Sequence, residues 1–188
     1  MSGGPHLDPS NKRIALLIAL LALVLAITET LGKGAQTNAL SANIEASNLW
    51  NFFQAKTVRM TTVRTAAEEL EVQLATVADP VHKAAMEKRI ADWQASAKRY
   101  DTEPETKEGR RELAARAKTS ETKRDLSLAA YHHFEVGSAA VQIAIVLASA
   151  TILTNATILA YIAGALGLIG IFFAGIGLIA PQSFHLFH

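Results

Sequence analysis

The fold is decided by two stretches near the C-terminus, VGSAAVQIAIVLASATILT (residues 136–154) and ILAYIAGALGLIGIFFAGIGLI (residues 158–179). From Val136 to His188 the chain contains no Asp, Glu, Lys or Arg. Each stretch has about the 20 residues that an α-helix needs to cross roughly 30 Å of hydrocarbon. Because an uncharged segment of this length would be insoluble if exposed, the pattern predicts an integral membrane protein.

A third apolar run, from Ile14 to Ile27, follows Lys12 and Arg13. Extended to Gly32, it reaches the length of a membrane span, residues 14–32, and brings Glu29 near the membrane boundary. The same run could be a signal peptide, but no small-x-small cleavage site follows it. We therefore expect an uncleaved first transmembrane helix.

The ends of the chain are expected to be tails. Residues 1–13 contain two glycines and two prolines and are predicted to be flexible. Residues 180–188 follow the last span and form the C-terminal tail.

The central segment, residues 33–135, carries almost all the remaining charge, with 16 Lys and Arg interleaved with 15 Asp and Glu. This mixing excludes the basic surface that binds nucleic-acid phosphates, so no nucleic-acid partner is expected. The chain has no cysteine, which excludes disulfides and thiolate metal sites.

Small or apolar residues recur in this segment with alternating spacings of four and three, and only Lys56 departs from the pattern. They are Ala35, Ala39, Ala42, Ala46, Leu49, Phe53, Met60, Val63, Ala67, Leu70, Leu74 and Val77, and are called the seam below. A sustained repeat of 3.5 residues is typical of a coiled coil, and the absence of glycine and proline predicts one continuous helix. Two alternatives remain open, because the seam can join two chains or pack inside its own chain.

Asp79 and Pro80 predict the end of this helix and the start of a second, with Asp79 as N-cap. A break is expected at residues 101–104, and a third helix is expected to begin near Glu105 and to continue into the second span. Helix lengths at about 1.5 Å per residue match only if the chain reverses at residues 79–80. The predicted fold is therefore all-α, with three transmembrane helices and a long antiparallel helical hairpin over residues 33–135.

Small residues four apart predict close packing between membrane helices. They are Ala140, Ala144 and Ala148 in the second span, and in the third span the pairs Ala160 with Gly164, Ala163 with Gly167, and Gly170 with Ala174. Gln142 in the second span is expected to make an interhelical hydrogen bond rather than to line a pore.

A polar cluster of Glu29, His132 and Glu135 is expected at the membrane interface. Imidazole and carboxylate could bind a metal or relay protons, but the spacing is not that of a metal site, and interfacial polar residues are the favoured interpretation. We predict no metal and no cofactor. No Ser stands in a G-x-S-x-G context, so an enzyme is not expected.

Three stretches carry a resemblance: residues 42–59 (ANIEASNLWNFFQAKTVR), 131–135 (YHHFE) and 142–149 (QIAIVLAS). They resemble an uncharacterised bacterial membrane-protein family catalogued as a domain of unknown function, and residues 50–56 are the most specific part. The resemblance implies one transmembrane helix, a helical insert and a transmembrane hairpin, with no catalytic residues to transfer.

The expected function is a non-enzymatic membrane scaffold or accessory subunit that self-associates through the seam. The alternative is a small oligomeric channel or other ion-conducting component. Expected partners are the lipid bilayer, further copies of the chain and a larger membrane complex. The expected location is the bacterial inner membrane, with multiple passes. Lys12 and Arg13 favour a cytoplasmic N-terminus and a periplasmic hairpin, whereas Lys33, Lys123 and Arg124 favour the reverse.

Overall fold

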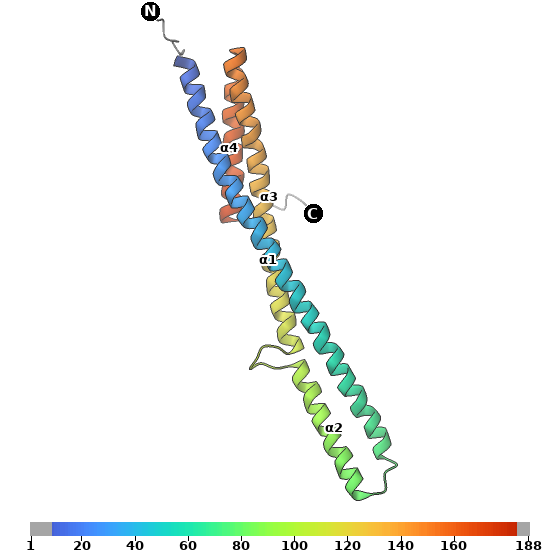
Figure 1. Ribbon diagram of the computed structural model, residues 1–188. Coiled ribbons are helices and arrows are strands. Elements are labelled where there is room, and N and C mark those ends of the chain that lie inside the picture. Colours follow the sequence, from blue (N-terminus) through green and yellow to red (C-terminus); the bar gives the residue numbers. More distant parts are fainter. Residues whose placement is uncertain (1–8, 184–188) are drawn as a thin grey trace, which may run out of the picture. The chain divides into compact units, whose positions relative to one another are not determined.

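A computed structural model describes residues 9–183 of the chain, and within them the regular secondary structure is helical, with no strand (Figure 1). The helices are α1 (Pro9–Leu74), α2 (Pro80–Asp101), α3 (Arg110–Thr154) and α4 (Thr157–Ile179). The chain divides into two compact units. Among the described residues the apolar unit comprises 9–40 and 123–183, and the charged unit comprises 41–122.

In both units α1 runs antiparallel to α3, and in the charged unit it also runs antiparallel to α2 (Figure 1). In the charged unit the contacts pair Trp50 with Glu121, Thr57 with Arg110, and Glu71 with Gln94, so residue numbers fall along one side as they rise along the other. In the apolar unit Glu29 pairs with Gln142 and Gly32 lies against Phe134, so the numbers again fall on α3 as they rise on α1. The antiparallel arrangement expected of the hairpin is therefore present inside the charged unit.

Three helices, α1, α3 and α4, are long and apolar enough to cross a membrane. Their apolar parts share a core of Leu21 from α1, Ala163 from α4, and Val141, Ala144 and Ala148 from α3. Large side chains on the outside of these helices, including Leu20, Leu23, Ile162 and Phe172, are exposed. A large exposed apolar surface of this kind is typical of a contact with a membrane or with another protein.

Glycines of α4 allow it to approach both α1 and α3 closely. A methyl group on Gly167 would lie 2.5 Å from Cδ2 of Leu21, and one on Gly170 would overlap the side chain of Val141. At Gly164, by contrast, the space is open. Of the predicted packing residues, Ala144, Ala148, Gly167 and Gly170 are buried, whereas Ala140, Ala160 and Gly164 are half-buried. These contacts lie within one chain.

The reversal between α1 and α2 is short. The helix α1 ends at Leu74, so Val77 lies in the turn rather than on the helical seam. At the start of α2 the Asp79 carboxylate accepts hydrogen bonds from the backbone N–H groups of Val81 and His82, at 3.3 and 3.2 Å. The cap expected at Asp79 is present because Asp satisfies free amides and Pro80 has none.

The third helix begins later than the sequence predicts, at Arg110 rather than near Glu105. Residues 102–109 form a folded connection in which Lys107 adopts a positive φ of 57°. The Glu112 carboxylate accepts a hydrogen bond from the backbone N–H of Glu103 at 3.2 Å. A side chain at Gly109 would overlap both groups. Because this contact holds residues 102–109 in a loop, α3 begins only at Arg110.

The N-terminal boundary also differs. Residues 9–13, predicted as part of the tail, belong to α1, because proline is favoured in the first turn of a helix. The remainder of that tail, residues 1–8, and residues 184–188 of the C-terminal tail lie outside the described residues.

Candidate functional site

None of the predicted seam residues is exposed in the single chain. Ala39, Ala42, Ala46, Leu49 and Ala67 are at most 8% exposed, and the other seam residues are half-buried. In the charged unit Leu49 packs with Leu113 and Ala117 of α3. The burial therefore supports the alternative in which the seam packs inside its own chain.

The opposite face of α1 is exposed and carries no charge over nearly seven turns. Its residues repeat with spacings of three and four and are called the outer stripe: Ser41, Ile44, Asn48, Asn51, Ala55, Val58, Thr62 and Thr65. The charges on α1 between residues 41 and 67 are Glu45, Lys56, Arg59 and Arg64, all outside this stripe. The pattern was missed from the sequence because it combines small, β-branched and amide residues rather than apolar ones alone.

Lys56, the exception in the seam, is 7% exposed. Its ammonium lies 5.3 Å from the centre of the Phe52 ring and 5.6 Å from that of Tyr100. It also pairs with Glu103 at 3.5 Å and with Glu108 at 3.9 Å. The lysine is thus tied to the connection between α2 and α3 by charge, and to Tyr100 of α2 by a cation–π contact.

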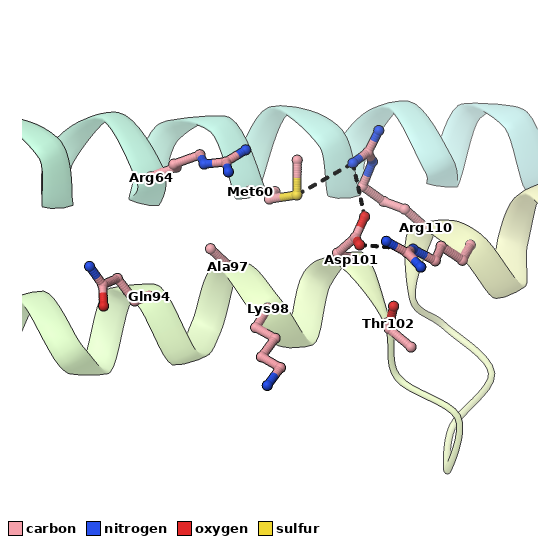
Figure 2. Close-up of a pocket in the computed structure, with 9 residues that line it drawn as sticks. Met60, Arg64, Gln94, Ala97, Lys98, Asp101, Thr102 and Arg110 are labelled. Carbon is pink, nitrogen blue, oxygen red and sulfur yellow. Dashed lines mark hydrogen bonds and ion pairs between the residues drawn. The ribbon is translucent and has the colours of Figure 1, made fainter.

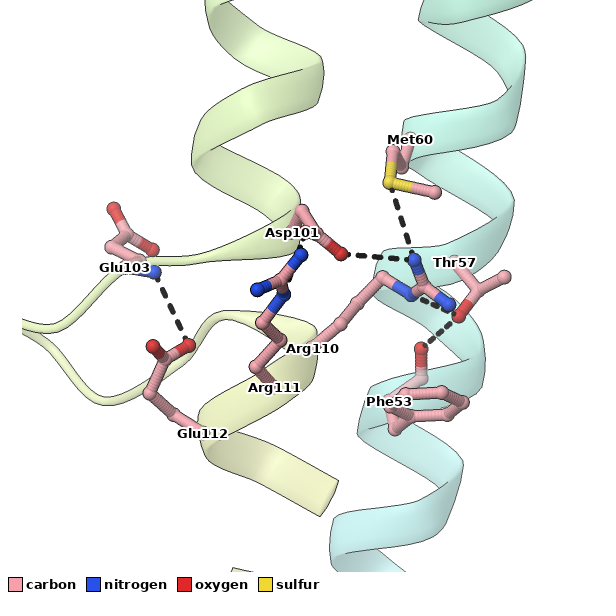
Figure 3. A network of polar contacts seen from close by, with 8 residues as sticks. All are labelled: Phe53, Thr57, Met60, Asp101, Glu103, Arg110, Arg111 and Glu112. Atoms are coloured by element: carbon pink, nitrogen blue, oxygen red, sulfur yellow. Dashed lines mark hydrogen bonds and ion pairs between the residues drawn. The ribbon is translucent and has the colours of Figure 1, made fainter. Parts of the chain in front are cut away.

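Arg110, at the start of α3, is held by four contacts (Figure 3). Its Nε donates to Thr57 Oγ1 at 2.9 Å, and its Nη1 donates to Asp101 Oδ1 at 3.1 Å and to Met60 Sδ at 3.4 Å. The guanidinium also lies 5.0 Å from the centre of the Phe53 ring. Three helices therefore converge on one side chain.

A second guanidinium reaches the same carboxylate, since Arg111 Nε donates to Asp101 Oδ2 at 2.9 Å. Both arginines line an open cavity of about 810 Å³ in the charged unit. Figure 2 shows this cavity, called the basic cavity below, between α1, α2 and the start of α3. The other lining residues are Met60, Arg64, Gln94, Ala97, Lys98, Asp101 and Thr102.

The predicted interfacial residues are partly brought together. Glu29 and Glu135 line one small cavity of about 300 Å³ in the apolar unit. His132 Nδ1 lies 3.6 Å from Glu135 Oε2 on the same helix. Among residues 9–183 no group of three or more His, Cys, Asp or Glu side chains is placed to hold a metal ion.

Gln142 makes the expected interhelical hydrogen bond, in which its Nε2 donates to Glu29 Oε1 at 3.1 Å. His133, next to His132 in the sequence, lies on a different face of α3 and is only 1% exposed. A nitrogen of its ring, Nε2, lies 3.1 Å from the carbonyl oxygen of Pro181. This histidine is part of the packing between α3 and the end of α4.

Comparisons with known proteins give one finding. The model of a family described as a domain of unknown function (DUF4337) matches residues 10–180, which is nearly the whole chain. No curated protein and no solved structure matches the chain.

Proposed function

This chain belongs to the DUF4337 family, and we propose that it is a non-enzymatic integral membrane scaffold or accessory subunit that self-associates through the outer stripe of α1. The observation that supports this proposal is the absence of charge from an exposed helix face. The seam residues are already covered in the single chain. Association therefore uses the opposite face of the same helix.

The lack of charge is local. Residues 41–122 contain 13 basic and 13 acidic residues, so a solvated helix face in this unit should carry several of them. The outermost positions of a coiled coil are normally charged or strongly polar, because they face water. Eight successive stripe positions without a charge are better suited to contact with another helix.

The chemistry of the stripe also suits helix packing. Ile44 and Val58 are 53% and 65% exposed, so their apolar surface is not used within the chain. The Thr62 hydroxyl donates to the Val58 carbonyl oxygen at 2.9 Å, so its hydrogen-bonding need is met within α1. An open depression of about 560 Å³ lies on this face, and it is bordered by Thr57, Val58, Thr61, Thr62, Thr65, Ala66 and Glu69.

A second copy of the chain is the partner that fits this surface. A symmetric dimer brings the same surface of both subunits together, so the stripe meets an identical uncharged stripe. Asn48 and Asn51 supply amides that can pair with each other across the interface, and such polar positions set the register of helix pairs. A partner recognised by charge would find no complementary group on the stripe.

Cysteine cross-linking tests the proposal directly, because the chain contains no cysteine. We would introduce Val58→Cys, Asn51→Cys or Ile44→Cys singly, oxidise the protein in native membranes, and measure the mass of the product. The expected result is a cross-linked species of twice the 20.1 kDa chain mass at each position. The matched controls are Ala67→Cys in the seam and Ala84→Cys on the exposed side of α2, which should stay monomeric.

Cross-linking at Ala67→Cys but not at the stripe positions would contradict association through the outer stripe. It would indicate that the seam forms the subunit interface. Monomers at every position, together with a monomeric mass in mild detergent, would contradict self-association altogether.

We also propose that α1, α3 and α4 cross the bacterial inner membrane, with the N-terminus cytoplasmic and residues 41–122 periplasmic. Three apolar helices support this proposal, and Lys12 and Arg13 beside the first apolar stretch support the orientation. In intact cells an impermeant thiol reagent should label Glu105→Cys and spare Ser2→Cys. The opposite labelling would reverse the orientation.

A further inference from the structure

We propose that the basic cavity of the charged unit binds a small, water-soluble anion that carries two linked phosphate groups. This site is separate from the outer stripe and does not depend on self-association.

The charges around the cavity are strongly unequal. Arg64, Arg110, Arg111 and Lys98 line it, and Asp101 is the one acidic residue that does so. The charged unit as a whole is balanced, with 13 basic and 13 acidic residues, so the excess is particular to this cavity. Concave sites lined by one sign of charge concentrate ions of the opposite sign.

The guanidinium groups that line the cavity have N–H groups that are not used in contacts with other described residues. A guanidinium has five N–H groups, yet in the described part of the chain no acceptor is found for Nη2 of Arg110 or for the terminal nitrogens of Arg111. Arg64 has only a 3.8 Å contact with Glu68, and both of these side chains are more than 60% exposed. An exposed pair of this kind is weak, so Arg64 can turn to a ligand.

The cavity is also held in position before any ligand arrives. Arg110 is 23% exposed and is fixed between Thr57, Asp101 and the Phe53 ring. Asp101 bridges Arg110 and Arg111 (Figure 3) and sets the distance between their guanidinium groups. Fixed donors lose little conformational freedom on binding, which favours affinity.

The class of ligand follows from the donors. Planar guanidinium groups match the oxygens of phosphate in a bidentate manner, and they do so better than lysine. A diphosphate offers oxygens to more than one guanidinium at once and carries a charge comparable with the excess in the cavity. The volume of about 810 Å³ exceeds that of two phosphates and leaves room for an organic group against Met60 and Ala97.

Calorimetric titration of the full chain in detergent with inorganic diphosphate tests the proposal. We expect saturable binding that weakens as ionic strength rises, and weaker binding of orthophosphate and sulfate. Arg64→Gln and Arg111→Gln should each reduce affinity about tenfold, because a charge-assisted hydrogen bond is lost. These two arginines are 68% and 75% exposed, so the variants should fold normally.

The matched control is Lys118→Gln, which removes the same charge from an exposed position of α3 outside the cavity and should leave affinity unchanged. Equal affinities of the native chain and the Arg64→Gln, Arg111→Gln double variant would overturn the proposal, as would the absence of saturable binding. Arginine-dependent binding of phosphatidic acid in mixed micelles, without binding of diphosphate, would overturn it in favour of a lipid headgroup.

Discussion

Gly170 on α4 lies against the backbone of Gly137 on α3, and a methyl group on Gly170 would be 2.8 Å from the Gly137 carbonyl oxygen. A methyl group on Gly137 would in turn lie 2.9 Å from the Gly170 carbonyl oxygen. The closeness is therefore mutual, and the two helices depend on hydrogen atoms at both positions. Where lipid surrounds helices, such close approach is a main source of their attraction.

Gly170→Ala should lower the free energy of unfolding by about 1 to 3 kcal/mol, because the added methyl overlaps Val141 and the Gly137 backbone. Thermal unfolding in detergent, followed by circular dichroism, measures the change. Gly164→Ala is the matched control on the same helix, since nothing lies within 4 Å of its added methyl. That control should be neutral or stabilising, because alanine favours helix. Equal destabilisation by both changes would mean that the close approach of Gly170 to α3 does not contribute to the free energy of unfolding.

Ala46→Gln should lower the melting temperature and leave the mass of the detergent-solubilised protein unchanged. Ala46 is 3% exposed in the single chain, so a larger side chain overpacks the contact between helices at a cost of about 1 to 3 kcal/mol. Helicity should survive, because glutamine is a good helix former. Glu45→Gln, at the exposed neighbouring position, should change neither quantity. A shift from oligomer to monomer at Ala46→Gln would instead place the seam between chains.

Lys56→Met should be much milder than Lys56→Glu. Methionine keeps the contacts with Phe52 and Tyr100. The two carboxylates that lose their partner, Glu103 and Glu108, are 22% and 50% exposed and can be hydrated, so we expect a loss of no more than about 1 kcal/mol. Glutamate would bring a third carboxylate to Glu103 and Glu108, and we expect a loss of about 3 kcal/mol or more. Chemical denaturation measures both changes.

The control for Lys56 is Arg59→Glu, the same charge reversal at an exposed position one turn away. It should change the free energy of unfolding by no more than about 0.5 kcal/mol. Strong destabilisation by Lys56→Met would show that the ammonium itself, rather than the volume of the side chain, is required.

Glu29 and Gln142 should be energetically coupled. A double-mutant cycle with Glu29→Ala and Gln142→Ala measures the coupling free energy, and interhelical hydrogen bonds in membrane proteins average about 0.6 kcal/mol with a maximum near 2. We expect a value in this range, with the single variants remaining folded. Additive effects of the two substitutions would mean that the 3.1 Å contact contributes nothing to stability.

Features set by neighbouring residues could be predicted from the sequence. Asp79 caps α2 because a carboxylate three residues before an amide can reach it, and Pro80 fits the first turn. The all-helical class follows from apolar runs of membrane-span length and from the helical repeat of residues 35–77, which contains no glycine or proline. The small-residue packing follows partly, since Ala144, Gly167 and Gly170 are buried, although Gly164 faces open space.

Features set by distant residues could not be predicted. The delayed start of α3 depends on the Glu112 carboxylate bonding to the Glu103 backbone, a contact that has no local signature. The basic cavity requires Arg64 from α1 to meet Arg110 and Arg111, which lie more than 40 residues later. Lys56 interrupts an otherwise small and apolar repeat. Its partners, Glu103 and Glu108, are too distant in the sequence for a local pattern to identify them.

The position of Trp50 between α1 and α3 makes the packing of these two helices observable by fluorescence. Its indole Nε1 donates to Glu121 Oε1 at 2.8 Å, and its ring meets Phe53 edge-on at 5.4 Å. The other tryptophan, Trp93, lies on α2 beneath Arg89. A Trp93→Phe chain therefore keeps a single indole between α1 and α3, and its emission wavelength reports when those two helices separate, without any attached dye.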